Sequence, residues 1–168
     1  MYDSDYDCIF IVKSWLHADI CDGVLNPCGL YIVIRKDRMG VRGGGICVLV
    51  KRTYQVTTIL FSDVYKDLEM IGVTLVDFSP KLDVFTVYRP SQCSTDPRQY
   101  LATLIDCLKV STQNSNTHVI VGDLNLPSID WNTLSCHGSE LGNLFLDFVI
   151  QYSWTQFVNF IIIIIIFV

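Results

Sequence analysis

The segment HVIVGDLN, residues 118–125, joins a run of strand-forming residues to two polar side chains. The run stops at Gly122, and Asp123 and Asn125 follow it two positions apart. Side chains alternate between the two faces of an extended chain, so a strand continuing through Asn125 would place both on one side. Gly122 has no Cβ and leaves room for a close neighbour or substrate. The pattern predicts a ligand site at the carboxyl end of a strand, where open α/β sheets bind ligands.

A simpler interpretation is a parallel strand followed by an ordinary polar turn, because Asp and Asn are common in turns. Two upstream segments weigh against it. TVYRP, residues 86–90, closes another apolar strand, and residues 35–48 place RKDR shortly before three glycines. Together with GDLNLPSIDW, residues 122–131, these motifs resemble the endonuclease/exonuclease/phosphatase superfamily. The order of the motifs and the residues in them are similar to those of the retrotransposon-type endonucleases that accompany the reverse transcriptase of non-LTR elements.

The resemblance implies roles for individual residues. Asp123 would orient and activate water, Asn125 would hydrogen-bond the phosphate region, and Tyr88 would help to hold the scissile phosphate. Arg89 would be a phosphate neighbour. The implied reaction is the Mg²⁺-dependent hydrolysis of a phosphodiester that nicks DNA, in which the metal neutralises phosphate charge and other groups stabilise the developing oxyanion.

One position departs from the family pattern. The related endonucleases carry an E-T-W-L or E-S-W-L segment whose Glu is the principal metal ligand, whereas this chain reads KSWL at residues 13–16. Lys13 takes the place of the carboxylate, and the only glutamates, Glu69 and Glu140, lie far downstream. An ammonium group cannot ligate Mg²⁺, so we expect poor metal binding and impaired catalysis. The family's catalytic Ser-Asp-His segment and N-terminal Asn also have no counterpart.

Local patterns predict the secondary structure. Helices should begin after Asp96, where Pro97 fits the first turn, and after Ser139. Apolar runs rich in β-branched residues predict strands near 8–12, 30–34, 46–50, 57–61, 71–76, 84–88 and 119–121. Strands followed by a strand and helix alternation indicate a layered α/β (α+β) domain. The resemblance refines this to a four-layer sandwich of two mixed β-sheets flanked by helices, incomplete at both ends.

The 168 residues suit a single domain. Family resemblance covers residues 8–158, as a partial domain, and residues 159–168 form an isoleucine-rich tail outside the pattern. We expect a truncated or frame-disrupted reading frame. The apolar end, from residue 157, is shorter than the roughly 20 residues needed to cross a bilayer, so no membrane span is expected. A strand continuing the preceding edge and an aggregation-prone end are the alternatives.

A net charge of −5 argues against a broad basic surface for nucleic acid, because such affinity comes mainly from neutralising phosphates. Any contact with DNA must be local, and Arg38 and Arg42 belong to the basic cluster at residues 35–52 that is the candidate. A solvated hairpin face is the alternative. Seven cysteines without a C-x-x-C pair, behind an acidic N-terminus, predict reduced thiols in an intracellular, nuclear or cytoplasmic protein that is not secreted.

The leading hypothesis is a truncated and impaired Mg²⁺-dependent phosphodiesterase, a DNA-nicking endonuclease domain derived from a non-LTR retrotransposon. The alternative is a non-catalytic phosphate- or nucleic-acid-binding module on the same fold, in which Lys13 supplies the positive charge of the ion. A phosphatase acting on inositol phosphates or sphingolipids would share the G-D-x-N motif. The YRP and triple-glycine segments argue against this third hypothesis.

Overall fold

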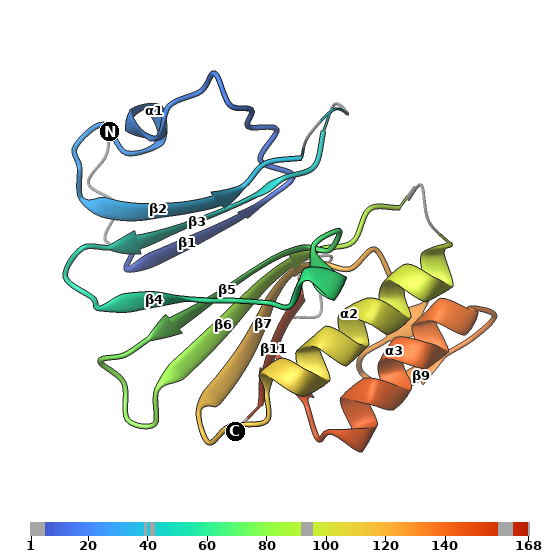
Figure 1. Cartoon of the computed structure of the whole chain (residues 1–168). Coiled ribbons are helices and arrows are strands. Elements are labelled where there is room, and N and C mark those ends of the chain that lie inside the picture. The colour runs from blue at the N-terminus through green and yellow to red at the C-terminus, as the bar shows by residue number, and fades with distance from the viewer. Residues whose placement is uncertain (1–5, 39, 41–42, 92–95, 158–162, 168) are drawn as a thin grey trace.

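The computed structural model of the chain describes residues 6–38, 40, 43–91 and 96–157, and the backbone of residues 163–167. Two β-sheets lie face to face, and two long helices cover the outer face of the larger sheet (Figure 1). A short helix lies over the outer face of the smaller sheet. The predicted four-layer α/β sandwich is therefore confirmed.

The smaller sheet has the order β1-β3-β2, formed by β1 (Cys8–Val12), β3 (Ile46–Lys51) and β2 (Tyr31–Lys36). Both of its ladders are antiparallel, so this sheet is not mixed. Helix α1 (Asp22–Leu25) supplies Leu25 to the apolar cluster on its outer face.

The larger sheet has the order β10-β11-β7-β6-β5-β4 and is mixed, because β6 and β7 run parallel while its other ladders are antiparallel. A parallel pair needs a long crossover, which α2 provides between β6 and β7. The strands are β4 (Val56–Ile59), β5 (Glu69–Leu75), β6 (Leu82–Tyr88), β7 (Thr117–Asp123), β10 (Thr155–Gln156) and β11 (Ile163–Phe167). Smaller elements are a 3-10 turn, η1 (Asp63–Tyr65), and a hairpin of β8 (Ile129–Asp130) and β9 (Ser135–Cys136).

Both predicted helix starts are confirmed. Helix α2 (Pro97–Ser111) begins after Asp96, whose side chain accepts a hydrogen bond from the backbone of Gln99. Helix α3 (Glu140–Gln151) begins after Ser139, whose hydroxyl accepts from the backbone of Gly142. These caps satisfy amide groups that have no partner within the helix.

The two faces of the larger sheet bury different clusters. The helix side packs Phe85 and Ile120 against α2 and α3. The other side packs Val73 and Val84 against Val48 of the smaller sheet. Residues of β6 and β7 alternate between these clusters, which fixes the side from which each strand residue projects.

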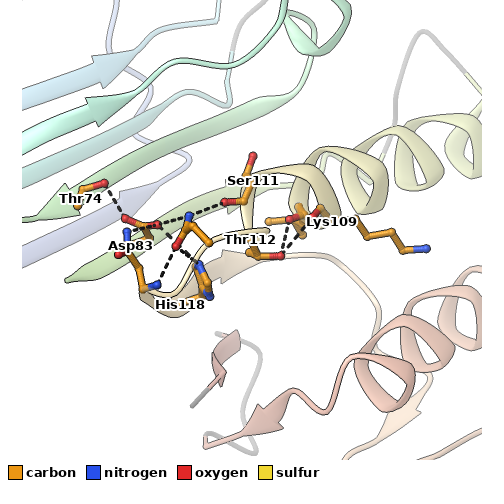
Figure 2. A network of polar contacts seen from close by, with 9 residues as sticks. Thr74, Asp83, Lys109, Ser111, Thr112 and His118 are labelled. Atoms are coloured by element: carbon orange, nitrogen blue, oxygen red, sulfur yellow. Dashed lines mark hydrogen bonds and ion pairs between the residues drawn. The ribbon is translucent and has the colours of Figure 1, made fainter. Parts of the chain in front are cut away.

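A buried network of polar side chains lies at the start of β6 and β7 in the larger sheet (Figure 2). Asp83 accepts hydrogen bonds from Thr74, Asn114 and Asn116, and His118 lies 3.7 Å from its carboxylate. Burial lowers the pKa of His118, an effect that the charge of Asp83 opposes. The network lies five residues along β6 from Tyr88, and it ties β5, β6 and β7 together at the opposite end of these strands.

The isoleucine-rich tail contributes β11, which lies between β10 and β7. It pairs antiparallel with β7, with Ile165 opposite Ile120. This corresponds to the extended-strand alternative for that part of the tail. Among the described residues, no helix has the length and apolar character to cross a membrane.

Candidate active site

Three polar residues form a row across the larger sheet. Glu69 at the start of β5 pairs with Tyr88 at the end of β6, and Tyr88 pairs with Asp123 at the end of β7. Directly paired residues project from the same face of a sheet. Tyr88 belongs to the cluster between the two sheets, so the row faces the smaller sheet. Tyr88 is 7% exposed and Asp123 is 6% exposed.

Lys13, directly after β1, reaches across to this row. Its ammonium donates a hydrogen bond of 2.8 Å to Oδ2 of Asp123 and lies 5.2 Å from the centre of the Tyr88 ring. The hydrogen bond to Asp123 raises the pKa of Lys13. Oδ1 of Asp123 accepts a 2.9 Å bond from the backbone of Asn125. Both carboxylate oxygens therefore have donors from within the chain.

Arg38 and Glu69 form a second ion pair on the other side of Tyr88. Nε of Arg38 donates to Oε1 of Glu69 at 2.8 Å, and the backbone N–H of Gly45 donates to Oε2 at 2.7 Å. The guanidinium carbon of Arg38 lies 5.7 Å from the centre of the Tyr88 ring. Tyr88 is thus flanked by a cation and a carboxylate on each side.

Glu69 is not among the site residues that the sequence motifs predict, because it lies far from those motifs in the chain. The signal that identifies it is the hairpin formed by β5 and β6. Its turn contains Asp77, Ser79 and Pro80, residue types that favour turns. Counting outward from the centre of that turn places Glu69 opposite Tyr88, as the register shows.

The triple glycine at residues 43–45 holds these cations in place. All three residues have positive φ, a conformation that favours glycine. A Cβ at Gly43 would contact the ring of Trp15, and one at Gly44 would overlap the Arg38 guanidinium. The backbone N–H groups of Ser14 and Trp15 donate to Gly45 and Gly44. The glycine backbone thus accepts hydrogen bonds from the loop that carries Lys13, and it leaves room for the side chain of Arg38.

The loop after β7 corrects one expectation. The strand ends at Asp123, and Asn125 has a φ of 50°, so the chain does not stay extended through Asn125. The Asn125 amide donates a 2.6 Å hydrogen bond to the carbonyl of Arg89, and Asn125 reaches Asp123 through its backbone N–H. The turn forms because the Asp123 carboxylate accepts the backbone N–H two residues on.

Arg89 lies behind this loop rather than on an open surface. It is 4% exposed, and its guanidinium donates 2.6 Å hydrogen bonds to the carbonyls of Leu124 and Asn125. It therefore fixes the shape of the loop. Gly122 allows the close approach that its sequence predicted, but the neighbour is β6, since a Cβ there would overlap the carbonyl of Val87.

The members of the basic cluster at residues 35–52 have different surroundings. Arg35 donates to Asp22, Asp37 and two backbone carbonyls, and Lys36 donates to the carbonyls of Lys66 and Leu68. Burial lowers the pKa of Lys36. These two cations stabilise loops within the domain and do not form a solvated face. Arg38 is the member that reaches Tyr88, and Arg42 lies outside the described residues.

The donor set does not fit a Mg²⁺ ion. Mg²⁺ requires an octahedron of oxygen ligands, usually including one or two carboxylates. Asp123 is neutralised by Lys13, and Glu69 is neutralised by Arg38. In the part of the chain that the structure describes, no group of three or more His, Cys, Asp or Glu residues could hold a metal.

The paired sheets and their flanking helices have the sandwich fold of the endonuclease/exonuclease/phosphatase superfamily. An AP endonuclease from Archaeoglobus fulgidus matches with a TM-score of 0.65 and 15% identity, over 95% of this chain and 76% of that one. A 3′ phosphatase, NExo, from Neisseria bound to a product DNA hairpin matches with a TM-score of 0.67 and 14% identity, over 98% and 77%. The catalytic domain of APE2 from Xenopus laevis matches with a TM-score of 0.63 and 14% identity, over 96% and 74%.

A sequence comparison gives a second similarity, independent of the fold. Residues 82–159 match the family model described as endonuclease-reverse transcriptase. The matched range runs from β6 to just beyond β10 and includes Tyr88, Asp123 and Asn125. Together the family match and the structural neighbours support the endonuclease/exonuclease/phosphatase superfamily. No curated protein matches the chain.

Proposed function

We propose that this chain is an incomplete phosphodiesterase-type domain, derived from a DNA-nicking endonuclease of a non-LTR retrotransposon, in which Mg²⁺-dependent catalysis is impaired. The family model described as endonuclease-reverse transcriptase supports the lineage. The Neisseria neighbour bound to a DNA hairpin supports DNA as the substrate of the ancestor. The observation that carries the proposal is the 2.8 Å ion pair between Lys13 and Asp123.

This ion pair explains the impairment in physical terms. A cation bound to Asp123 would have to displace the Lys13 ammonium and then remain next to it. Both steps oppose binding, because breaking the ion pair costs energy at the largely buried Asp123 carboxylate and because the ammonium and a metal ion a few ångströms apart would repel each other. Without an ion, the site loses the several kcal/mol that a metal contributes to the charged transition state.

A second candidate function, phosphate binding without a metal, is favoured by the same contacts. The Lys13 side chain is 44% exposed, and an ammonium has three donors, so it can bind an anion while it contacts Asp123. The Arg38 guanidinium, which is paired with Glu69, lies 5.7 Å from the centre of the Tyr88 ring and is a second group that can donate to phosphate oxygens. This arrangement supports a non-catalytic module that binds the phosphates of a nucleic acid, with Lys13 in place of an ion.

Nicking of supercoiled plasmid in Mg²⁺ tests the proposal, with the unmodified chain compared with Lys13→Glu and Asp123→Ala. We expect little or no nicking by the unmodified chain. Robust nicking that Asp123→Ala leaves untouched would refute the assignment of the site. Calorimetric titration adds a second readout, in which Lys13→Glu gains Mg²⁺ binding because it restores a carboxylate next to Asp123.

Titration with DNA in EDTA separates the two functions. A metal-independent binder keeps its affinity in EDTA and loses affinity in Lys13→Gln. Binding that requires Mg²⁺ in the unmodified chain would contradict the phosphate-binding module.

A further inference from the structure

Trp15 is a large aromatic side chain left 56% exposed beside the candidate site. It follows Lys13 by two residues, on the loop after β1. A chain advances at most about 3.6 Å per residue, so the two Cα atoms lie within about 7 Å. Lys13 and Trp15 therefore lie close together on one short loop, so a single ligand can contact both side chains.

The backbone fixes the position of the indole. Trp15 has a φ of 56°, uncommon for a residue with a side chain, and its N–H donates a 3.0 Å hydrogen bond to the carbonyl of Gly44. A Cβ built on Gly43 would lie 3.8 Å from the indole ring, so the ring packs alongside the glycine backbone. The loop that carries the indole is thus held by a backbone hydrogen bond, and a loop that is already ordered loses less entropy on binding.

The same three glycines lie next to Trp15 and to Arg38, and Lys13 lies near Arg38 across the Tyr88 ring. Arg38 occupies the space at Gly44, next to the indole at Gly43, and Arg38 and Lys13 both lie within 6 Å of the Tyr88 ring centre. An exposed aromatic surface beside two cations suits a ligand with a flat apolar group next to an anion. A nucleotide has this composition, with its base and its phosphate.

We propose that Trp15 is a stacking platform for an unstacked base of single-stranded DNA whose phosphate lies at Lys13 and Arg38. The inference rests on the proposed phosphate-binding function and names the form of nucleic acid that the site prefers. A base within a duplex is stacked on both faces and cannot lie on the indole, whereas an unpaired base can. Because every base has a π-face, the platform accepts different base types.

Fluorescence anisotropy in EDTA at low salt tests this with two labelled strands of equal length. One strand is oligo-dT, and the other carries abasic sites throughout, so it keeps the phosphates and lacks the bases. The unmodified chain, Trp15→Ala, Trp15→Phe and Lys13→Gln are compared. Phe78→Ala is the matched control, because Phe78 is 44% exposed and lies in the turn between β5 and β6, at the end of the sheet away from Tyr88.

We expect the unmodified chain to bind oligo-dT more tightly than the abasic strand. Trp15→Ala should weaken oligo-dT binding about 5- to 140-fold, the range given by stacking on one base, and change abasic binding less than twofold. Trp15→Phe should retain most of the affinity, and Phe78→Ala should retain all of it. Lys13→Gln should weaken binding of both strands.

Equal binding of the two strands by the unmodified chain would overturn the platform and leave the phosphate site standing, and this comparison needs no variant. Equal losses for both strands in Trp15→Ala would overturn it as well. If the unmodified chain binds neither strand, the proposed phosphate-binding function fails and the inference fails with it.

Discussion

Replacement of Lys13 by Met removes the cation from Asp123 while it keeps an unbranched side chain of similar length. The Asp123 side chain is 8% exposed, so its carboxylate would stay largely buried with the backbone N–H of Asn125 as its remaining described donor. A buried charge that loses its partner destabilises the folded state, because water cannot replace the lost contact.

The two exposed fractions bound the size of the effect. Loss of one partner from a fully buried ion pair costs about 3–5 kcal/mol, whereas an exposed pair contributes about 0–1 kcal/mol. The Lys13 side chain is 44% exposed, so water screens one half of the pair. We therefore expect the free energy of unfolding to fall by about 1–3 kcal/mol. For a domain of this size, that lowers the Tm by about 2–12 °C.

Thermal melts of Lys13→Met, Asp123→Asn and the double variant measure the interaction as a double-mutant cycle. The double variant should lose less stability than the sum of the single variants, because Asn needs no cation. Lys51→Met is the matched control. Lys51 lies 3.3 Å from Asp7, whose side chain is 58% exposed, so its loss should cost less than about 1 kcal/mol. Additive effects of Lys13→Met and Asp123→Asn would refute the ion pair as the energetic centre of the site.

Two further predictions concern the frame around the site. Burial holds the pKa of His118 below its usual value of 6.5. On acidification the unfolded chain therefore takes up a proton at His118 before the folded chain does, so the free energy of unfolding should be lower at a pH below about 6.5 than at about pH 7.5. Urea melts at both pH values check this, and a His118→Gln variant with the same pH dependence would contradict it. Gly122→Ala should destabilise the domain by about 3 kcal/mol or more, because its φ is 148° and the added Cβ would overlap the carbonyl of Val87. Gly40→Ala, at a φ of 74° in the left-handed helical region and with open space around it, should cost only about 1 kcal/mol in thermal melts.

The sequence predicts the elements well where their signals are local. Asp96 and Ser139 start their helices because a capping side chain needs only the next three residues to act. The strands follow from short runs of β-branched residues in the same way. The direction of pairing is less local, and the antiparallel nature of the smaller sheet depends on contacts between β1 and β3, which are far apart in the chain.

The site is predicted only in part because it depends on registers and long side chains. The motifs pointed to Tyr88 and Asp123, and the parallel register of β6 and β7 pairs them. Glu69 joins them through the register of a different hairpin, which no single motif contains. The position of Arg89 beside Tyr88 in the sequence predicts a contact with phosphate. Its length lets it turn back to the loop after β7 and bind two carbonyls there.

The balance of charge at the row explains how the site can persist without an ion. Two carboxylates that project between packed sheets would repel each other and lose hydration, so the folded state needs positive charge beside them. The structure supplies it from the smaller sheet's loops, with Lys13 on Asp123 and Arg38 on Glu69. Each pair also links one sheet to the other, so the cations contribute to the sandwich as well as to the site. Lys13 therefore stabilises the folded state through the same contact that, in the proposed function, opposes a metal ion at Asp123.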